Sequence, residues 1–158
     1  MTTLNEGIIR IIDFNDTGLV RSLYELQRES YLIEAKLINF YEIPPLKETF
    51  EEFQACGEQF RGYFLNNQLA GAVSCTSEEE AVTICRMVVH PDHFKKGIAQ
   101  QLLNTLESDM GHVSLFKVAT GKDNVPAKNL YLKNGYKHER DMEVAPDFYI
   151  SFFQKTVS

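Results

Sequence analysis

The sequence predicts a mixed α/β fold, in which helices and strands alternate around a mixed, mostly antiparallel sheet. The chain has 158 residues, of which 44% are hydrophobic and 24% charged, as is typical of one globular domain. Apolar residues recur with a helical period in some segments and with a period of two in others. Short β-branched runs are bounded by Gly, Pro and Asn, which indicates strands. We therefore expect one domain over 1–158, with six to seven strands and roughly four helices.

The N-terminal third is expected to hold one strand and two helices. Residues 7–14 are rich in the β-branched residue Ile and are predicted as a strand. A helix should begin at 15–18 and end at the proline pair 44–45, because proline cannot continue a helix. Ser30 interrupts its apolar face, so either one bent helix or two joined helices fit, and a second helix is expected over 47–55. Spacings of three, four and seven define the predicted core face of the first helix, namely Leu19, Leu23, Leu26, Ile33, Leu37 and Phe40.

The middle of the chain is predicted to form three successive strands and a helix. The apolar period is two from residue 59 onward, which gives strands over 60–65, 69–75 and 81–90. Residues 66–68 (Asn-Asn-Gln) suit a hairpin turn. The acidic run at 77–80 is interpreted as a solvated turn rather than a metal site. The helix that begins at Gly97 should stop at Gly111.

The last third is predicted to alternate strand, helix and two strands. The strand covers 113–119, and the helix begins at Asn124, since Asn caps helix N-termini and Pro126 suits a first turn. The terminal strands are expected over 136–142 and 148–156. The strand-helix-strand unit over 81–119 should be parallel and right-handed.

Composition excludes several classes of function. The net charge is −6, from 16 Lys and Arg against 22 Asp and Glu, which argues against binding nucleic acid through a basic face. An acidic surface suits cationic substrates, and it equally serves solubility. No apolar run approaches ~18 residues and no leader pattern is evident, so no membrane span is expected. Cys56, Cys75 and Cys85 form no Cys-x-x-Cys pair, so we expect neither disulfides nor a metal site, and a cytoplasmic protein.

The segment 87–100 carries the first motif. It is a buried strand that stops at Pro91, crosses a basic loop with Lys95 and Lys96, and enters a helix at Gly97. A helix N-terminus has unpaired N–H groups and about half a positive charge, so it favours anions. Gly97 and Ala99 keep side-chain bulk away from the backbone. The segment suits a pyrophosphate held beside an extended strand, and so a nucleotide-type cofactor.

The second motif is Asn124, followed seven residues later by Tyr131 and then by Gly135-Tyr136. Together the two motifs resemble the GNAT superfamily of N-acetyltransferases, which use acetyl-CoA. In that family a strand ending in Val-x-Pro leads to a loop of the form Arg/Gln-x-x-Gly-x-Gly/Ala that binds the CoA pyrophosphate. Here Phe94 stands where Arg or Gln is usual. The resemblance covers roughly residues 60–140, and the N-terminal third matches only in pattern.

The resemblance implies a bulge in the strand that ends at Val89, which splays the parallel pair apart and leaves main-chain groups free at a cofactor cleft. Met87, Val88 and Val89 would pair with the pantetheine arm, and an N–H near Val89 would hold the thioester carbonyl. Asn124 would contact the arm or its phosphates while also capping its helix. The implied cofactor-binding residues are Met87, Val88, Val89, Lys95, Lys96, Gly97, Ile98, Ala99, Gln100 and Asn124.

Tyr131 is the predicted catalytic residue. In the family a Tyr at this position protonates the departing CoA thiolate, and a positioned acid is worth ~10²–10⁴ in rate. The alternative is a core tyrosine whose hydroxyl is tied to the backbone. In the family the general base is a Glu, a water chain or no dedicated group, and the side-chain candidates here are Glu34, Glu42, Arg86 and Cys85. The residues around Glu34 are compatible with an amine pocket and equally with ordinary helix packing, namely Tyr31, Asn39, Tyr41 and Glu42.

Two functions remain open from the sequence. The first is transfer of an acetyl group from acetyl-CoA to a primary amine of a small molecule or peptide, by direct attack within a ternary complex. The second is a non-catalytic acyl-CoA-binding domain of the same fold. The glycine patterns of dinucleotide and P-loop sites are absent from the sequence. No metal is expected, and the edges of the terminal strands are compatible with a homodimer.

Overall fold

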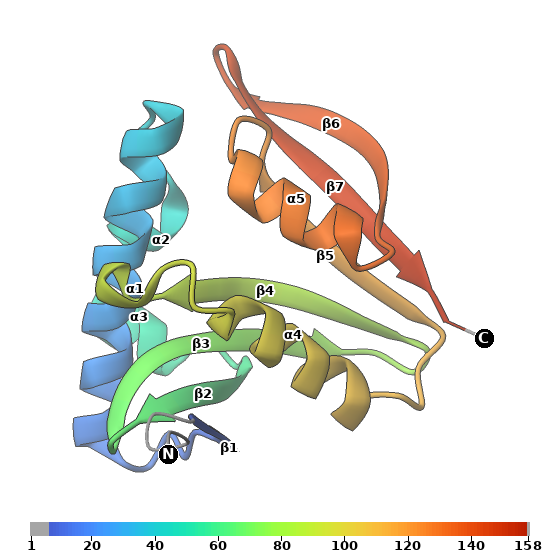
Figure 1. Cartoon of the computed structure of the whole chain (residues 1–158). Coiled ribbons are helices and arrows are strands. Elements are labelled where there is room, and N and C mark those ends of the chain that lie inside the picture. Colours follow the sequence, from blue (N-terminus) through green and yellow to red (C-terminus); the bar gives the residue numbers. More distant parts are fainter. Residues whose placement is uncertain (1–6, 158) are drawn as a thin grey trace.

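A seven-stranded sheet with the order β1-β2-β3-β4-β5-β7-β6 organises the computed structural model, which describes residues 7–157 (Figure 1). Its strands are β1 (Ile8–Ile11), β2 (Gln59–Leu65), β3 (Gln68–Ser77), β4 (Ala81–Val89), β5 (Leu115–Gly121), β6 (Lys137–Ala145) and β7 (Phe148–Thr156). The predicted hairpin turn is confirmed between β2 and β3. Asn66 and Asn67 have φ values of 51° and 66° there, as a type I′ turn requires.

The predicted parallel pair is β4 and β5, and it separates along its length. Residues 81–84 of β4 pair with 115–118 of β5, while the other neighbouring strands pair antiparallel. On the side of β3, Ile84 faces Cys75 and Arg86 faces Ser74, so Cys85 is an extra residue in β4. Such a bulge bends a strand. Beyond it β4 continues away from β5, and Figure 1 shows the two strands diverging. The splayed pair expected from the resemblance is confirmed.

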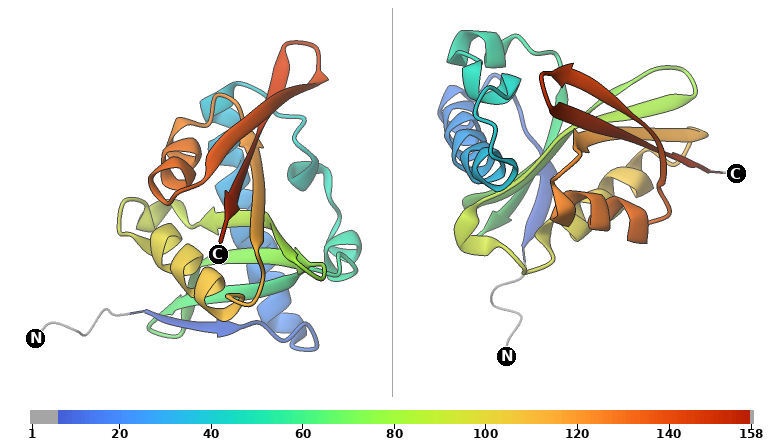
Figure 2. Two further views of the ribbon diagram at one scale, coloured as in Figure 1. Left: turned by 90° about the vertical axis from the view of Figure 1, so that its right-hand side faces the viewer. Right: turned by 90° about the horizontal axis from the view of Figure 1, so that it is seen from above.

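Helices cover the two faces of the sheet unequally. The first face holds α1 (Thr17–Ile38), α2 (Pro44–Lys47) and α3 (Phe50–Gln54), and the second holds α4 (Ile98–Asp109) and α5 (Val125–Lys133) (Figure 2). Each face has its own core. Val20, Leu23 and Phe53 pack on the first face, and Leu102, Leu106 and Phe116 pack on the second. None of the described helices is long and apolar enough to cross a bilayer.

The boundaries in the first helical layer differ from those predicted. α1 is continuous through Ser30 and ends at Ile38, where Asn39 adopts the left-handed conformation that closes helices. The proline pair 44–45 begins α2 instead of ending α1, because proline is well suited to a first helical turn. The helix expected over 47–55 is wrong as one element. Thr49 caps a new helix through a capping box with Glu52, which separates α3 from α2.

The predicted core face of α1 is correct only in its first half. Leu23 is buried there, whereas Ile33 and Leu37 are 41% and 53% exposed. In the second half, Tyr31 and Ala35 point into the protein instead. Apolar spacing alone predicted the aliphatic residues to be buried. It does not count a side chain with a polar group, so it gave no signal for Tyr31.

A buried ionic network joins α1 and the loops around α3 to β4. Arg86 Nη1 donates to Glu48 Oε1 (2.7 Å) and to Gln27 Oε1 (2.6 Å), and its Nε donates to Glu58 Oε1 (2.9 Å). Ser74 Oγ on β3 also donates to Glu58. Burial acts to lower the pKa of Arg86, but its hydrogen bonds to Glu48 and Glu58 raise it overall. The network therefore stays charged and fixes α1 beside the bulge of β4.

Candidate active site

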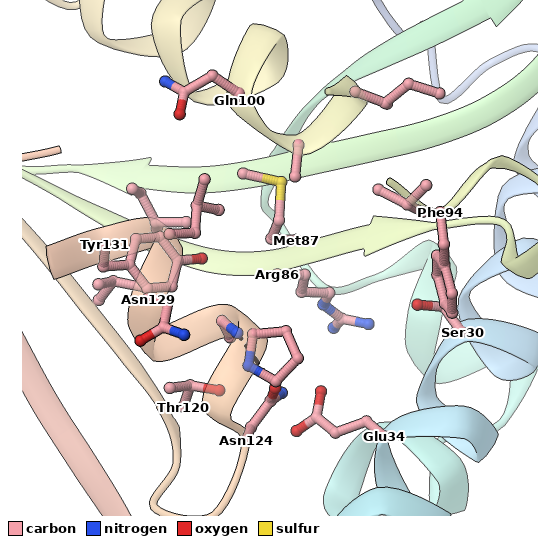
Figure 3. A pocket seen from close by; sticks show the side chains of 18 of the residues that line it. Ser30, Glu34, Arg86, Met87, Phe94, Gln100, Thr120, Asn124, Asn129 and Tyr131 are labelled. Atoms are coloured by element: carbon pink, nitrogen blue, oxygen red, sulfur yellow. Dashed lines mark hydrogen bonds between the residues drawn. The ribbon is translucent and has the colours of Figure 1, made fainter. Parts of the chain in front are cut away.

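A cavity of about 610 Å³ lies where β4 and β5 separate. Its walls come from α1, from the second half of β4, from the loop and first turn of α4, from the end of β5 and from α5. Figure 3 shows side chains from these elements pointing into the cavity. Most of the predicted site residues line it, namely Met87, Val89, Lys95, Gly97, Ile98, Ala99, Gln100, Asn124 and Tyr131. Val88 and Lys96 do not.

The main chain of β4 faces the cavity at alternate residues. His90 N–H donates to Ala70 O at 2.8 Å, and in an antiparallel pair every second residue bonds to the same neighbour. The register pairs Val88 with Ala72, so the N–H and C=O of Val88 point toward β3. Those of Met87 and Val89 point to the opposite side, where β5 has moved away. The Val88 side chain is buried in the core of the first face.

The N-terminus of α4 closes one end of the cavity. Gly97 is its N-cap, with φ 78° and no side-chain cap, so the first N–H groups of the helix are left available. A Cβ at Gly97 would meet no protein atom within 4 Å, which means that a ligand can approach this backbone closely. Lys95 has φ 64° and lines the cavity. Lys96 instead lies with its Nζ 3.3 Å from His93 Nδ1.

α5 brings Asn124 and Tyr131 to the opposite wall. Asn124 Oδ1 accepts from Ala127 N–H at 3.2 Å, which confirms the predicted cap. The Tyr131 ring is 3% exposed and packs against Tyr136. Its hydroxyl has no hydrogen-bond partner among the described residues, and Figure 3 shows the oxygen pointing into the cavity. Burial and the charge of Glu34 raise the pKa of Tyr131, so it is a neutral phenol that can donate a proton.

Among the candidate bases that line the cavity, Glu34 is the one with a carboxyl group. Burial raises its pKa, and the Asn124 side chain offsets part of this rise. Figure 3 shows the two side chains pointing toward each other. Gly121 at the end of β5 lies next to α1, since a Cβ there would be at ordinary contact distance, 3.4 Å from Ile38 Cδ1 and 4.0 Å from Glu34 Oε2.

The other three candidate bases are unsuitable. Glu42 does not line the cavity and is paired with Lys47 at 2.6 Å. Arg86 lines it but is held as a cation by the ionic network. Cys85 also lines it, and desolvation raises the pKa of its thiol, which is the opposite of an activated nucleophile. The predicted alternatives therefore reduce to Glu34.

Several wall residues were missed by sequence reasoning or named without a role. Tyr31 is buried at the cavity, and burial together with Glu34 raises its pKa. Ser30, Thr120 and Asn129 add neutral polar groups. Motif spacing holds no signal for them, because they come together only when α1, the end of β5 and α5 meet in the folded chain. Among the described residues, no three side chains of the metal-binding types gather at one point.

Comparisons with known proteins agree with this geometry. Residues 20–136 match the model of the Acetyltransferase (GNAT) family. The chain belongs to the GNAT acetyltransferase family. This membership confirms the resemblance seen in the motifs.

One curated protein and two solved structures are similar to this GNAT protein over most of its length. UPF0157 protein YqkA of Bacillus subtilis (strain 168) is 32% identical over 146 residues, which are 92% of this chain but only 43% of that protein. The chain thus spans less than half of this relative. PaiA N-acetyltransferase from Thermoplasma acidophilum, solved with coenzyme A, has a TM-score of 0.76 at 20% identity, covering 96% of this chain and 99% of that one. The ribosomal-protein-S18-alanine N-acetyltransferase from Escherichia coli has a TM-score of 0.78 at 14% identity, covering 96% and 94%.

Proposed function

We propose that the protein transfers an acetyl group from acetyl-CoA to a primary amine by direct attack, without an acyl-enzyme. One observation carries this proposal above the others. The Tyr131 hydroxyl is unpartnered among the described residues and points into a cavity bounded by free main chain and by an uncapped helix N-terminus. The main chain and the helix N-terminus suit the binding of a CoA thioester, and a phenol in this place can assist the departure of the thiolate by protonating it.

The described residues fit acetyl-CoA, which supplies the acetyl thioester. The N–H groups at the start of α4 and the Lys95 side chain would hold the pyrophosphate. The main chain of Met87 and Val89 would pair with the pantetheine amides, as an added strand does. One of the N–H groups on this side of β4, near Val89, is also suited to stabilise negative charge on the acetyl oxygen.

Two side chains would move protons. An ammonium must lose a proton before it attacks, and Glu34 is placed to accept it and pass it to solvent. As the N–C bond forms and the C–S bond breaks, Tyr131 gives its phenolic proton to the sulfur. The tyrosinate then regains a proton from solvent, which receives the second proton that the nitrogen loses as the amide forms. The raised pKa of Glu34 suits its role, because it makes the carboxylate a better base, while Tyr131 stays protonated until negative charge develops on the sulfur.

The direct test is release of the CoA thiol from acetyl-CoA in the presence of a panel of primary amines, with calorimetric titration of CoA alongside. We expect both CoA binding and amine-dependent thiol release. If CoA binds and no amine is acetylated, the non-catalytic binding domain is the correct alternative. If CoA does not bind, the assignment of the cavity is wrong.

A paired substitution tests the phosphate end. Lys95→Gln should weaken CoA binding about tenfold, since a charge-assisted hydrogen bond is worth about 1.5 kcal/mol. Lys96→Gln should weaken it less, because Lys96 does not line the cavity. Lys117→Gln is the matched control, as this exposed lysine on β5 lies outside the cavity. Equal effects at Lys95 and Lys117 would contradict the placement of the pyrophosphate.

A further inference from the structure

The wall that α1 contributes to the cavity has one charged side chain among apolar and neutral polar ones. It consists of Ser30, Tyr31, Ile33, Glu34 and Leu37, which recur along one side of the helix. Ile33 and Leu37 are 41% and 53% exposed, although the apolar period places them on the predicted core face. Large aliphatic side chains left exposed at the edge of a cavity offer surface to an apolar ligand.

Charge is divided between the two ends of this cavity. Among the described residues that line it, Glu34 is the single carboxylate. Lys95 lies just before α4 and Lys133 ends α5, so the cations belong to the end proposed for phosphates. Arg86 is paired with two carboxylates of its own. The α1 wall therefore offers one negative charge in otherwise neutral surroundings.

We propose that this face of α1 is the acceptor subsite and that it selects primary amines with a single positive charge on an apolar aliphatic or aryl body. The inference rests on the proposed function. The ammonium would pair with Glu34, while the body would pack on Ile33 and Leu37. A second cationic group would lose water without gaining a second carboxylate within the described lining, which is costly.

Two acidic residues outside the cavity lining, one after α1 and one on β6, are already paired. Glu42, which follows the end of α1, is already paired with Lys47 at 2.6 Å. Asp141 on β6 contacts His138 at 2.7 Å and Lys122 at 3.7 Å. Neither carboxylate lines the cavity, so neither belongs to the wall that would meet a dication or a polyamine.

The test compares acceptors that differ only in charge. Hexylamine and hexamethylenediamine have the same carbon chain, and the diamine carries a second ammonium. We expect kcat/KM to be at least about tenfold higher for hexylamine, with phenethylamine resembling hexylamine, and spermidine and kanamycin resembling the diamine. Equal or higher kcat/KM for the diamine would overturn the proposal.

A matched pair of variants locates the effect. Leu37→Glu adds a second carboxylate three residues after Glu34 on the cavity face, and should lower the preference for hexylamine over the diamine about threefold to fivefold. Leu32→Glu makes the same change at a side chain that is 47% exposed but does not line the cavity, and should leave the ratio unchanged. Equal shifts in both variants would overturn the proposal. If Leu37→Glu does not fold, the wild-type ratio still decides.

Binding separates this proposal from the proposed function. Both amines are titrated by calorimetry into the wild-type protein saturated with CoA, which needs no turnover. If hexylamine binds more tightly than the diamine while no amine is acetylated, the proposed function fails and the subsite stands. If the amines are acetylated without this preference, the subsite fails and the proposed function stands. If neither amine binds and neither is acetylated, both fail.

Discussion

Two neighbouring tyrosines allow the chemistry of the site to be separated from its stability. Tyr131 and Tyr136 pack edge to face with ring centroids 5.5 Å apart, and both are almost fully buried. Their hydroxyls differ. That of Tyr136 donates to Glu107 Oε2 at 2.7 Å, whereas that of Tyr131 has no partner among the described residues. The substitutions Tyr131→Phe and Tyr136→Phe therefore remove the same hydroxyl group, which is hydrogen-bonded in Tyr136 and unpaired with any described residue in Tyr131.

The structure gives the magnitudes expected for each variant. Tyr136→Phe removes a hydrogen bond to a carboxylate, worth about 1.5–3 kcal/mol. Because Lys155 still pairs with Glu107 at 2.9 Å, we expect a loss near the lower value, about 1.5 kcal/mol, and a fall in Tm of about 3–6 °C. Tyr131→Phe breaks no hydrogen bond with a described residue, so the free energy of unfolding should change by no more than about 0.5 kcal/mol.

The kinetic effects should be the reverse. A positioned acid contributes ~10²–10⁴ in rate, and a thiolate leaves readily because its conjugate thiol has a pKa of about 8.5. We therefore expect Tyr131→Phe to lower kcat about 100-fold, and at least about tenfold, while the Kd for CoA changes less than about twofold. Tyr136→Phe should retain kcat. The assays are thiol release under saturating acetyl-CoA, calorimetry with CoA, and thermal unfolding. Unchanged turnover in Tyr131→Phe would refute the assignment of the acid.

Two further predictions concern buried charge. Glu34→Gln should raise Tm at neutral pH and lose this gain in acid. Glu34 has a higher pKa in the native protein than in the unfolded chain, so the free energy of unfolding falls as the pH rises from the unfolded-state pKa to the native-state pKa. A Glu34→Gln variant that is less stable than the wild type at neutral pH would contradict this. Arg86→Met should leave Glu48 and Glu58 without their cation. The free energy of unfolding, measured by urea titration, should fall by about 3 kcal/mol or more. A fall of less than about 1 kcal/mol would show that the two carboxylates find other partners.

Local signals predicted the parts of the site that depend on a few consecutive residues. Gly97 begins α4 and Asn124 caps α5, as their sequence contexts indicated. The turn at 66–67 also follows from a short-range pattern, and the parallel pairing of β4 with β5 follows from the order strand, helix, strand. Helix caps and tight turns are decided by backbone conformation within one turn of chain, so sequence alone is sufficient for them.

Contacts between distant segments decided the rest. Periodicity placed Ile33 and Leu37 in the core, but both are largely exposed. Apolar residues at helical spacing can lie on more than one side of a helix, and the elements that pack against the helix decide which side is buried. The burial that raises the pKa of Glu34 likewise arises where α1 meets the end of β5 beside Asn124. Which main-chain groups of β4 are free depends on the register with β3 and on the bulge at Cys85. Hydrophobic burial and desolvation act over all neighbours in space, so these properties appear only once the chain is folded.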